Sequence, residues 1–149
     1  MPEQATMRRA QRDKAEGKAP STQAGEFVRE EMHHIREGKH GARSTKQAIA
    51  IGLSKARRAG VRLPAPRAGK TETRRQAQRD YARGSRARSA RRNPTRSRAT
   101  TRALKREPHR AASRKSLARQ ARTAARRRSP QARSRSAQRA ARTRKQTRH

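Results

Sequence analysis

Large apolar side chains are concentrated in one stretch of this chain, between residues 27 and 63. Nine of the 14 Val, Ile, Leu, Met, Phe and Tyr residues lie in that stretch, and only Tyr81, Leu104 and Leu117 follow it. Such a pattern indicates one small region that can form an apolar core, followed by a long region that cannot bury enough apolar surface to do so.

The first element that the pattern predicts is a helix over about residues 22–37. Ala24 and four larger residues recur at helical spacing and form one apolar stripe: Phe27, Val28, Met32 and Ile35. Ser21 or Thr22 is suited to cap the start of this helix. Gly38 is suited to the left-handed position that follows its end.

A second helix is predicted over residues 45–59. Ser44 and Gln47 have the spacing of a capping box, and Gly60 marks the end. One face of this helix carries small and apolar residues, among them Ile49, Gly52 and Leu53. Since glycine inside a helix costs about 1 kcal/mol relative to alanine, Gly52 predicts a close approach of another helix.

The short link between the two helices predicts a helical hairpin over residues 21–63. We expect its core to consist of Phe27, Val28, Met32, Ile35, Ile49 and Leu53. The first helix is rich in glutamate and the second carries only cations, which we interpret as charge complementarity between the helices rather than as an acidic docking face. Because so small a core barely offsets the entropy of ordering the chain, a homodimer through the Ile49/Leu53 face is a further possibility.

The flanking regions are predicted to lack a packed core. Residues 1–20 are polar and are expected to form a disordered or transiently helical arm. Pro64 and Pro66 end the apolar stretch, and residues 64–149 are expected to form a long Arg/Ala-rich tail that is disordered when free. Pro94, Pro108 and Pro130 divide this tail into segments that could become helical on a polyanion. The predicted fold class is therefore mostly α.

Charge is distributed as unevenly as hydrophobicity. The whole chain has a formal net charge of +34, and residues 61–149 contribute +28 of it, with 31 Lys and Arg against three acids. Arginine outnumbers lysine 27 to 4 in that part, and guanidinium groups bind phosphate oxygens in a bidentate manner. The tail therefore predicts binding to the phosphates of nucleic acid, with little dependence on base sequence.

The residues that we expect to bind phosphates lie at the end of the second helix and in the arginine clusters of the tail. They are Arg57, Arg58, Arg74, Arg75, Arg91, Arg92, Arg126, Arg127, Arg128, Arg142 and Arg144. Only two aromatic residues are present for stacking on bases, which favours duplex DNA or structured RNA over single strands. We expect a nucleoid-associated DNA-binding protein. The alternatives are an RNA- or ribosome-associated protein, and a protein-interaction hairpin that the tail anchors to a polyanion.

Other chemistries have less support. Glu31 and His34 have the Glu-x-x-His spacing of di-metal bundles, but the second helix offers no ligand, so no metal site is predicted. The chain has no cysteine and no phosphate-binding glycine loop or nucleophile motif, so we expect no cofactor and no enzyme activity. It has no signal peptide and no apolar run long enough for a membrane span, which predicts a cytoplasmic location and no membrane partner.

The run GKHGARSTKQAIAIGLSKARRAG, residues 38–60, resembles the signature of a family of small bacterial proteins catalogued as a domain of unknown function. That signature is similar to KQAIAIGLSxARxAG. The resemblance implies a bacterial helical module without an established activity. The tail lies outside it and is similar in composition to the basic tails of linker-histone-like bacterial proteins.

Overall fold

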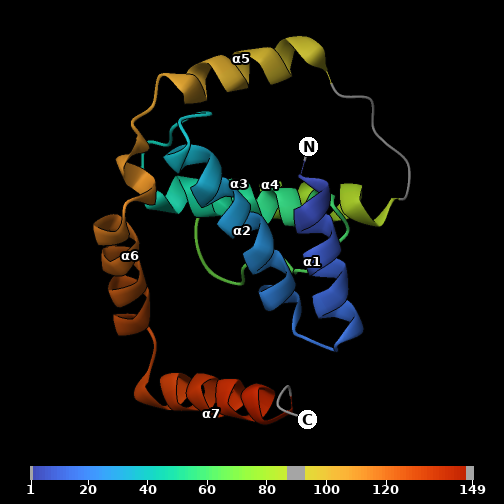
Figure 1. Cartoon of the computed structure of the whole chain (residues 1–149), viewed down its shortest axis with the longest axis vertical. Coiled ribbons are helices and arrows are strands. Elements are labelled where there is room, and N and C mark those ends of the chain that lie inside the picture. Colours follow the sequence, from blue (N-terminus) through green and yellow to red (C-terminus); the bar gives the residue numbers. More distant parts are fainter. Residues whose placement is uncertain (1, 87–92, 147–149) are drawn as a thin grey trace. The chain divides into compact units, whose positions relative to one another are not determined.

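The computed structural model describes residues 2–86 and 93–146, and all of their regular structure is helical (Figure 1). The chain divides into two units, Met1–Ser113 and Arg114–His149. The first unit contains the helices α1 (Gln4–Ala15), α2 (Pro20–Arg36), α3 (Thr45–Arg58), α4 (Thr71–Ser85) and α5 (Pro94–Lys105) and the 3-10 helix η1 (His109–Ala112). The second contains α6 (Arg114–Arg126) and α7 (Pro130–Gln146). The predicted mostly α class is confirmed.

The prediction of a single hairpin is wrong, because α2 and α3 are part of a larger bundle. The two helices do pack against each other, but α1 also packs on α2, and α4 packs on α3 (Figure 1). Ala10 of α1 is buried in one cluster with Ala24, Phe27, Ala56 and Val61. The first helix of the bundle thus covers apolar surface that a hairpin alone would expose to water. The predicted disorder of residues 1–20 is not what the structure shows.

The helix ends follow the predicted local signals in most cases. α2 starts at Pro20 rather than at Thr22, because a proline at the first helical position needs no hydrogen bond for its nitrogen. Ser44 accepts a hydrogen bond from the Gln47 amide at 3.2 Å, which confirms the cap of α3. The Gln47 side chain accepts from Arg43 N at 2.7 Å and does not complete the capping box at Ser44. Gly38 has the predicted positive φ, +73°.

The predicted core residues divide into two groups. Phe27, Met32 and Ile35 are buried, whereas the other three are half-buried: Val28, Ile49 and Leu53. Leu53 packs against the central apolar cluster, so the face predicted to form a homodimer is partly used within the chain. The close approach at Gly52 is confirmed, since a Cβ atom there would lie 2.7 Å from Val28 Cα on α2.

The packed structure continues past residue 64 into the segment assigned to the tail. α4 buries Ala77 and Asp80 against the bundle, and residues 104–112 dock on the α2–α3 connection. Gly41 N donates to Leu104 O at 2.8 Å, and Thr45 Oγ1 donates to Ala111 O at 2.7 Å. The expected disorder of the tail is not confirmed, because its described residues form α4 to α7. Two of these helices begin at prolines that the sequence marked, Pro94 and Pro130.

Candidate functional site

The described arginines that were predicted to bind phosphate are divided between the two units. Arg91 and Arg92 lie outside the described residues. Arg58, Arg74 and Arg75 lie on α3 and α4 of the first unit, whereas the second unit carries five that are exposed: Arg126, Arg127, Arg128, Arg142 and Arg144. Clustering along the sequence therefore does not by itself define one binding surface.

Arg57 has a place inside the fold that differs from its predicted role. Its side chain is buried, and the guanidinium donates to Leu63 O at 3.1 Å and to Pro64 O at 3.2 Å. Burial lowers the pKa of this guanidinium from its ordinary value, and the nearby carboxylate of Asp80 opposes that effect. Since its donors hold the chain that follows α3, we do not count Arg57 among the phosphate-binding residues.

Two of the other predicted arginines, Arg58 and Arg74, are also less available to a ligand, since one pairs with a buried carboxylate and the other is partly covered. Arg58 Nε lies 3.6 Å from Asp80 Oδ1, and Asp80 is 1% exposed. Arg74 is half-buried, and its Nε has no hydrogen-bond partner among the described residues. The exposed cations of α4 are instead Arg75, Arg79 and Arg83, which are spaced by four residues along one face.

The clearest cationic surface lies on α6. Four exposed residues recur at spacings of four, three and four and so share one face of the helix: Lys115, Arg119, Arg122 and Arg126. Leu117 and Thr123 lie outside this stripe and are half-buried. Lys115 and Arg126 are 11 positions apart, which corresponds to about 17 Å along the helix axis. We call these four residues the α6 stripe.

Shorter stripes of the same type occur on the neighbouring helices of the tail. α5 has Arg98, Arg102 and Lys105 at spacings of four and three, and all three are exposed. α7 has the same spacing in Arg135, Arg139 and Arg142, again with all three exposed. The excess of cations is evident from composition, whereas this periodicity becomes visible in the sequence only once the helices are known.

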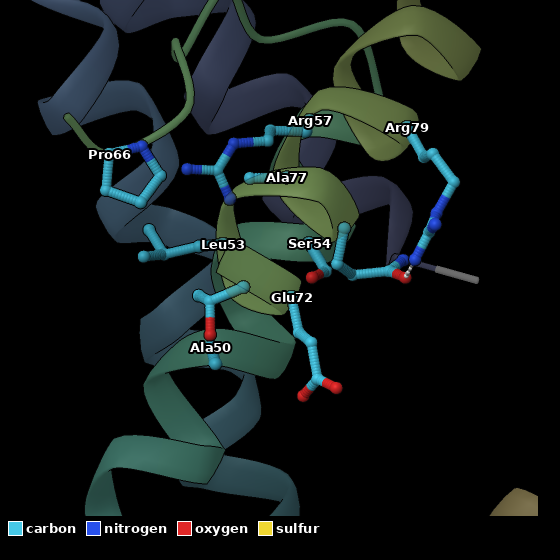
Figure 2. Close-up of a pocket in the computed structure, with 10 residues that line it drawn as sticks. Ala50, Leu53, Ser54, Arg57, Pro66, Glu72, Ala77 and Arg79 are labelled. Carbon is cyan, nitrogen blue, oxygen red and sulfur yellow. Dashed lines mark hydrogen bonds between the residues drawn. The ribbon is translucent and has the colours of Figure 1, made fainter. Parts of the chain in front are cut away.

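A pocket of about 420 Å³ opens between α3 and α4 (Figure 2). Leu53 and Ser54 enter it from α3, Glu72 and Ala77 from α4, and Pro66 from the connection between them. The lining is mixed, because the polar residues Ser54 and Glu72 stand beside apolar ones such as Leu53 and Pro66.

A second site lies in the interior between α1, α2 and the α2–α3 connection. Glu31 is 0% exposed, and His34 and His40 are half-buried beside it. The ligand atoms of these three residues lie within 4.8 Å of one another. Lys55 of α3 faces the same region, with Nζ 2.7 Å from Glu31 Oε2 and 3.5 Å from Glu30 Oε1. The two lysine contacts confirm the predicted charge complementarity between the helices.

The edge of this region is formed by Glu3 of the chain's first segment. His34 Nε2 lies 2.9 Å from Glu3 Oε1, and Lys39 Nζ lies 3.4 Å from the same oxygen. Hydrogen bonds from His34 and Lys39 hold the pKa of Glu3 below its ordinary value. Lys39 also pairs with Glu37 at 3.0 Å, which raises the pKa of Lys39. The sequence alone gave no sign that Glu3 reaches α2.

Residues 19–67 match the profile of a family of unknown function, DUF6496. The matched part includes all of α2 and α3 and most of the connection to α4, which is about a third of the chain. A search of curated proteins found no match, and neither did a search of solved structures. The resemblance of the hairpin segment to a family of unknown function is therefore confirmed, and DUF6496 carries no named activity to transfer.

The basic helices α5 to α7 lie outside the segment that matches DUF6496. No helix in the described part of the chain is both long and apolar enough to cross a membrane. A function can therefore be proposed only from the features described above, which are the cationic stripes of α5 to α7 and the cluster of Glu31, His34 and His40.

Proposed function

We propose that this protein binds nucleic acid through phosphate contacts, without sequence specificity and without catalysis, and that duplex DNA is its main target. The observation that carries the proposal is the α6 stripe, four exposed cations on one helix face in a unit that contains no acid. Residues 114–149 hold 14 Lys and Arg and no Asp or Glu. This segment therefore supplies no Asp or Glu side chain that could pair with the cations of the stripe.

The spacing of the α6 stripe suits a phosphate backbone. Successive cations of the stripe are three or four residues apart, which places them about 5–6 Å from one another along the helix. Phosphates of one DNA strand rise by about 3.4 Å each along the duplex axis, so the roughly 17 Å of the stripe lies beside several of them. Arginine, which provides three of the four cations, binds each phosphate through two donors.

Repulsion between the cations of each helix also favours binding, because a bound polyanion would relieve it. Like charges at i and i+4 destabilise an isolated helix by about 0.2–0.5 kcal/mol per pair. α5, α6 and α7 all contain such pairs. Phosphates that neutralise the arginines would remove the repulsion, so we expect binding to stabilise these helices.

Duplex DNA is favoured because the exposed surface has almost nothing that reads bases. Tyr81 is the exposed aromatic residue of the described chain, and single-strand readers rely on several aromatic rings for stacking. Contacts to phosphates alone fit a role in coating or compacting DNA, as in association with a bacterial nucleoid. A structured RNA offers similar phosphates and is the alternative that the experiment must separate.

The test is a salt titration of binding to a labelled 30-base-pair duplex, measured by fluorescence anisotropy. The informative variant replaces the α6 stripe with glutamine: K115Q, R119Q, R122Q and R126Q. Each lost phosphate contact lowers the slope of log K against log salt by about 0.9, so we expect a decrease of roughly 3–4.

A matched control keeps the same change in net charge but places it on the first unit. R8Q, R29Q, K46Q and R62Q remove three arginines and one lysine that are all exposed. We expect this variant to change the slope by less than about 1. Equal slopes for the two quadruple variants would show that net charge alone governs binding, and the proposed role of the stripe would be wrong.

Competition decides between the polymers. Unlabelled duplex DNA and a structured RNA hairpin of equal phosphate count are added to the labelled complex over the same salt series. Stronger competition by the duplex is the expected result. Stronger competition by the hairpin would replace the nucleoid role with an RNA-associated one, and binding that does not change with salt would exclude the phosphate mechanism altogether.

A further inference from the structure

We propose that Glu31, His34 and His40 bind a divalent transition metal, with Zn²⁺ as the best fit. One carboxylate and two imidazoles form a ligand set that suits Zn²⁺, with a fourth position left for water. Mg²⁺ and Ca²⁺ prefer oxygen ligands and fit this set poorly. These three residues belong to the first unit, whereas the α6 stripe belongs to the second.

The state of Glu31 is the first reason for the proposal. Its side chain is 0% exposed, and neither carboxylate oxygen accepts a hydrogen bond from the described residues. A buried carboxylate costs several kcal/mol unless charge and hydrogen bonds compensate it. Lys55 Nζ compensates Oε2 at 2.7 Å, which leaves Oε1 facing His40 Nε2 at 3.3 Å.

The orientation of His40 is the second reason. Its Nδ1 lies 3.1 Å from the carbonyl oxygen of Gly41, and since a carbonyl only accepts, Nδ1 carries a proton. The other ring nitrogen, Nε2, faces the carboxylate of Glu31. A metal ion bound by both atoms, or a proton on Nε2, would join Nε2 to the carboxylate oxygen at this distance of 3.3 Å. A backbone hydrogen bond on the other ring nitrogen is also the usual support of a histidine that binds metal.

His34 has the same kind of support. Its Nε2 lies 2.9 Å from Glu3 Oε1, so a carboxylate outside the ligand set orients the ring. The two histidine rings are 6.2 Å apart between centroids and nearly perpendicular, at 82°. Residues 31 and 34 share one face of α2, and the connection after Gly38 returns His40 to that face.

The local charge also favours a divalent cation, although the chain as a whole is strongly basic. Four carboxylates and two ammonium groups surround the site, an excess of two negative charges when the histidines are neutral: Glu3, Glu30, Glu31, Glu37, Lys39 and Lys55. A divalent ion would balance that excess. Two ligands of a tetrahedral zinc are about 3.4 Å apart, so the present 4.8 Å spread must contract by about 1.4 Å on binding.

Isothermal titration of the full-length protein with Zn²⁺ tests the proposal. We expect one saturable site per chain that Mg²⁺ does not occupy. E31Q, H34Q and H40Q should each weaken it by more than the roughly 10–100-fold that loss of a supporting outer residue causes, and E3Q should weaken it within that range. H33Q is the matched control, because His33 is exposed on the same helix and lies outside the ligand set.

A second measurement needs no variant and so does not depend on the variants folding. Long-range ¹H–¹⁵N spectra of the wild-type protein should show ring nitrogens of His34 and His40 shifting with one equivalent of Zn²⁺, while those of His33 do not move. Absence of saturable binding, an equal loss in H33Q, or shifts confined to other histidines would each overturn the proposal.

Discussion

Gly52 offers the sharpest test of how α2 and α3 are packed. A Cβ atom at this position would lie 2.7 Å from Val28 Cα and 3.0 Å from both Val28 N and Val28 Cγ2. Ordinary contact begins near 3.4 Å, so the methyl group of Gly52→Ala would overlap by about 0.7 Å. The nearest atoms belong to backbone, and α2 must therefore move away from α3 as a unit.

The expected cost follows from two opposing contributions. Overpacking of this kind costs about 1–3 kcal/mol, and alanine recovers about 1 kcal/mol through its higher helix propensity. Because no flexible side chain can absorb the overlap with Cα, we take the upper part of the first range. The free energy of unfolding of Gly52→Ala should therefore fall by about 1–2 kcal/mol.

Gly25→Ala is the matched control, because Gly25 is also inside a helix of the same pair. No atom lies within 4 Å of the Cβ that it would gain, so only the propensity changes. Gly25→Ala should raise stability by up to about 1 kcal/mol. The two variants should then differ by about 2–3 kcal/mol, which corresponds to roughly 10 °C in Tm for a unit of this size.

The measurement is urea and thermal unfolding of the full chain, followed by circular dichroism at 222 nm and by the fluorescence of Tyr81. Tyr81 is the single tyrosine and lies on α4, so its signal reports on the bundle without the helices of the second unit. If Gly52→Ala were as stable as Gly25→Ala, the close contact between α2 and α3 would be refuted.

Three further substitutions test other parts of the fold. Gly41→Ala places a methyl group against the carbonyl of Glu107, so residues 104–112 should detach. Hydrogen exchange of the amides of residues 41 and 42 should then accelerate, and unchanged protection of these amides would argue against the docking. Asp80→Asn removes a buried charge paired with Arg58 and should lower the free energy of unfolding in urea by about 1–3 kcal/mol. Its control, Glu72→Gln on the exposed surface of α4, should lower it by less than about 0.5 kcal/mol. Arg57→Gln should lower stability by about 1–3 kcal/mol but leave the salt slope of DNA binding unchanged. A reduced slope would return Arg57 to the phosphate-binding set.

The sequence predicted the existence and the ends of α2 and α3 well, because helix stripes and caps depend only on residues that are close in the sequence. The apolar stripe from Phe27 to Ile35, the cap at Ser44 and the left-handed Gly38 all act within one or two helical turns. Even Gly52, whose role involves another helix, was visible because glycine is unfavourable inside a helix unless something requires it.

The packing of α1 and α4 could not be predicted in the same way. Their buried positions are small or polar, such as Ala10 and Ala77 or Thr6 and Asp80, so neither helix has a stripe of large apolar residues. Each is buried only because a neighbouring helix supplies the complementary surface. Composition alone therefore assigned these residues to an arm and a tail.

For the candidate sites, the sequence determined the excess of cations and the tertiary structure decided which residues can be used. Net charge is a sum over residues and needs no fold, so the proposal of nucleic-acid binding could be made from the sequence alone. Whether a given arginine faces solvent depends on packing, which is why the sequence could not show that Arg57 is buried. The cluster of Glu31, His34 and His40 required the turn after α2 to bring His40 back, and distances of that kind exist only in the folded chain.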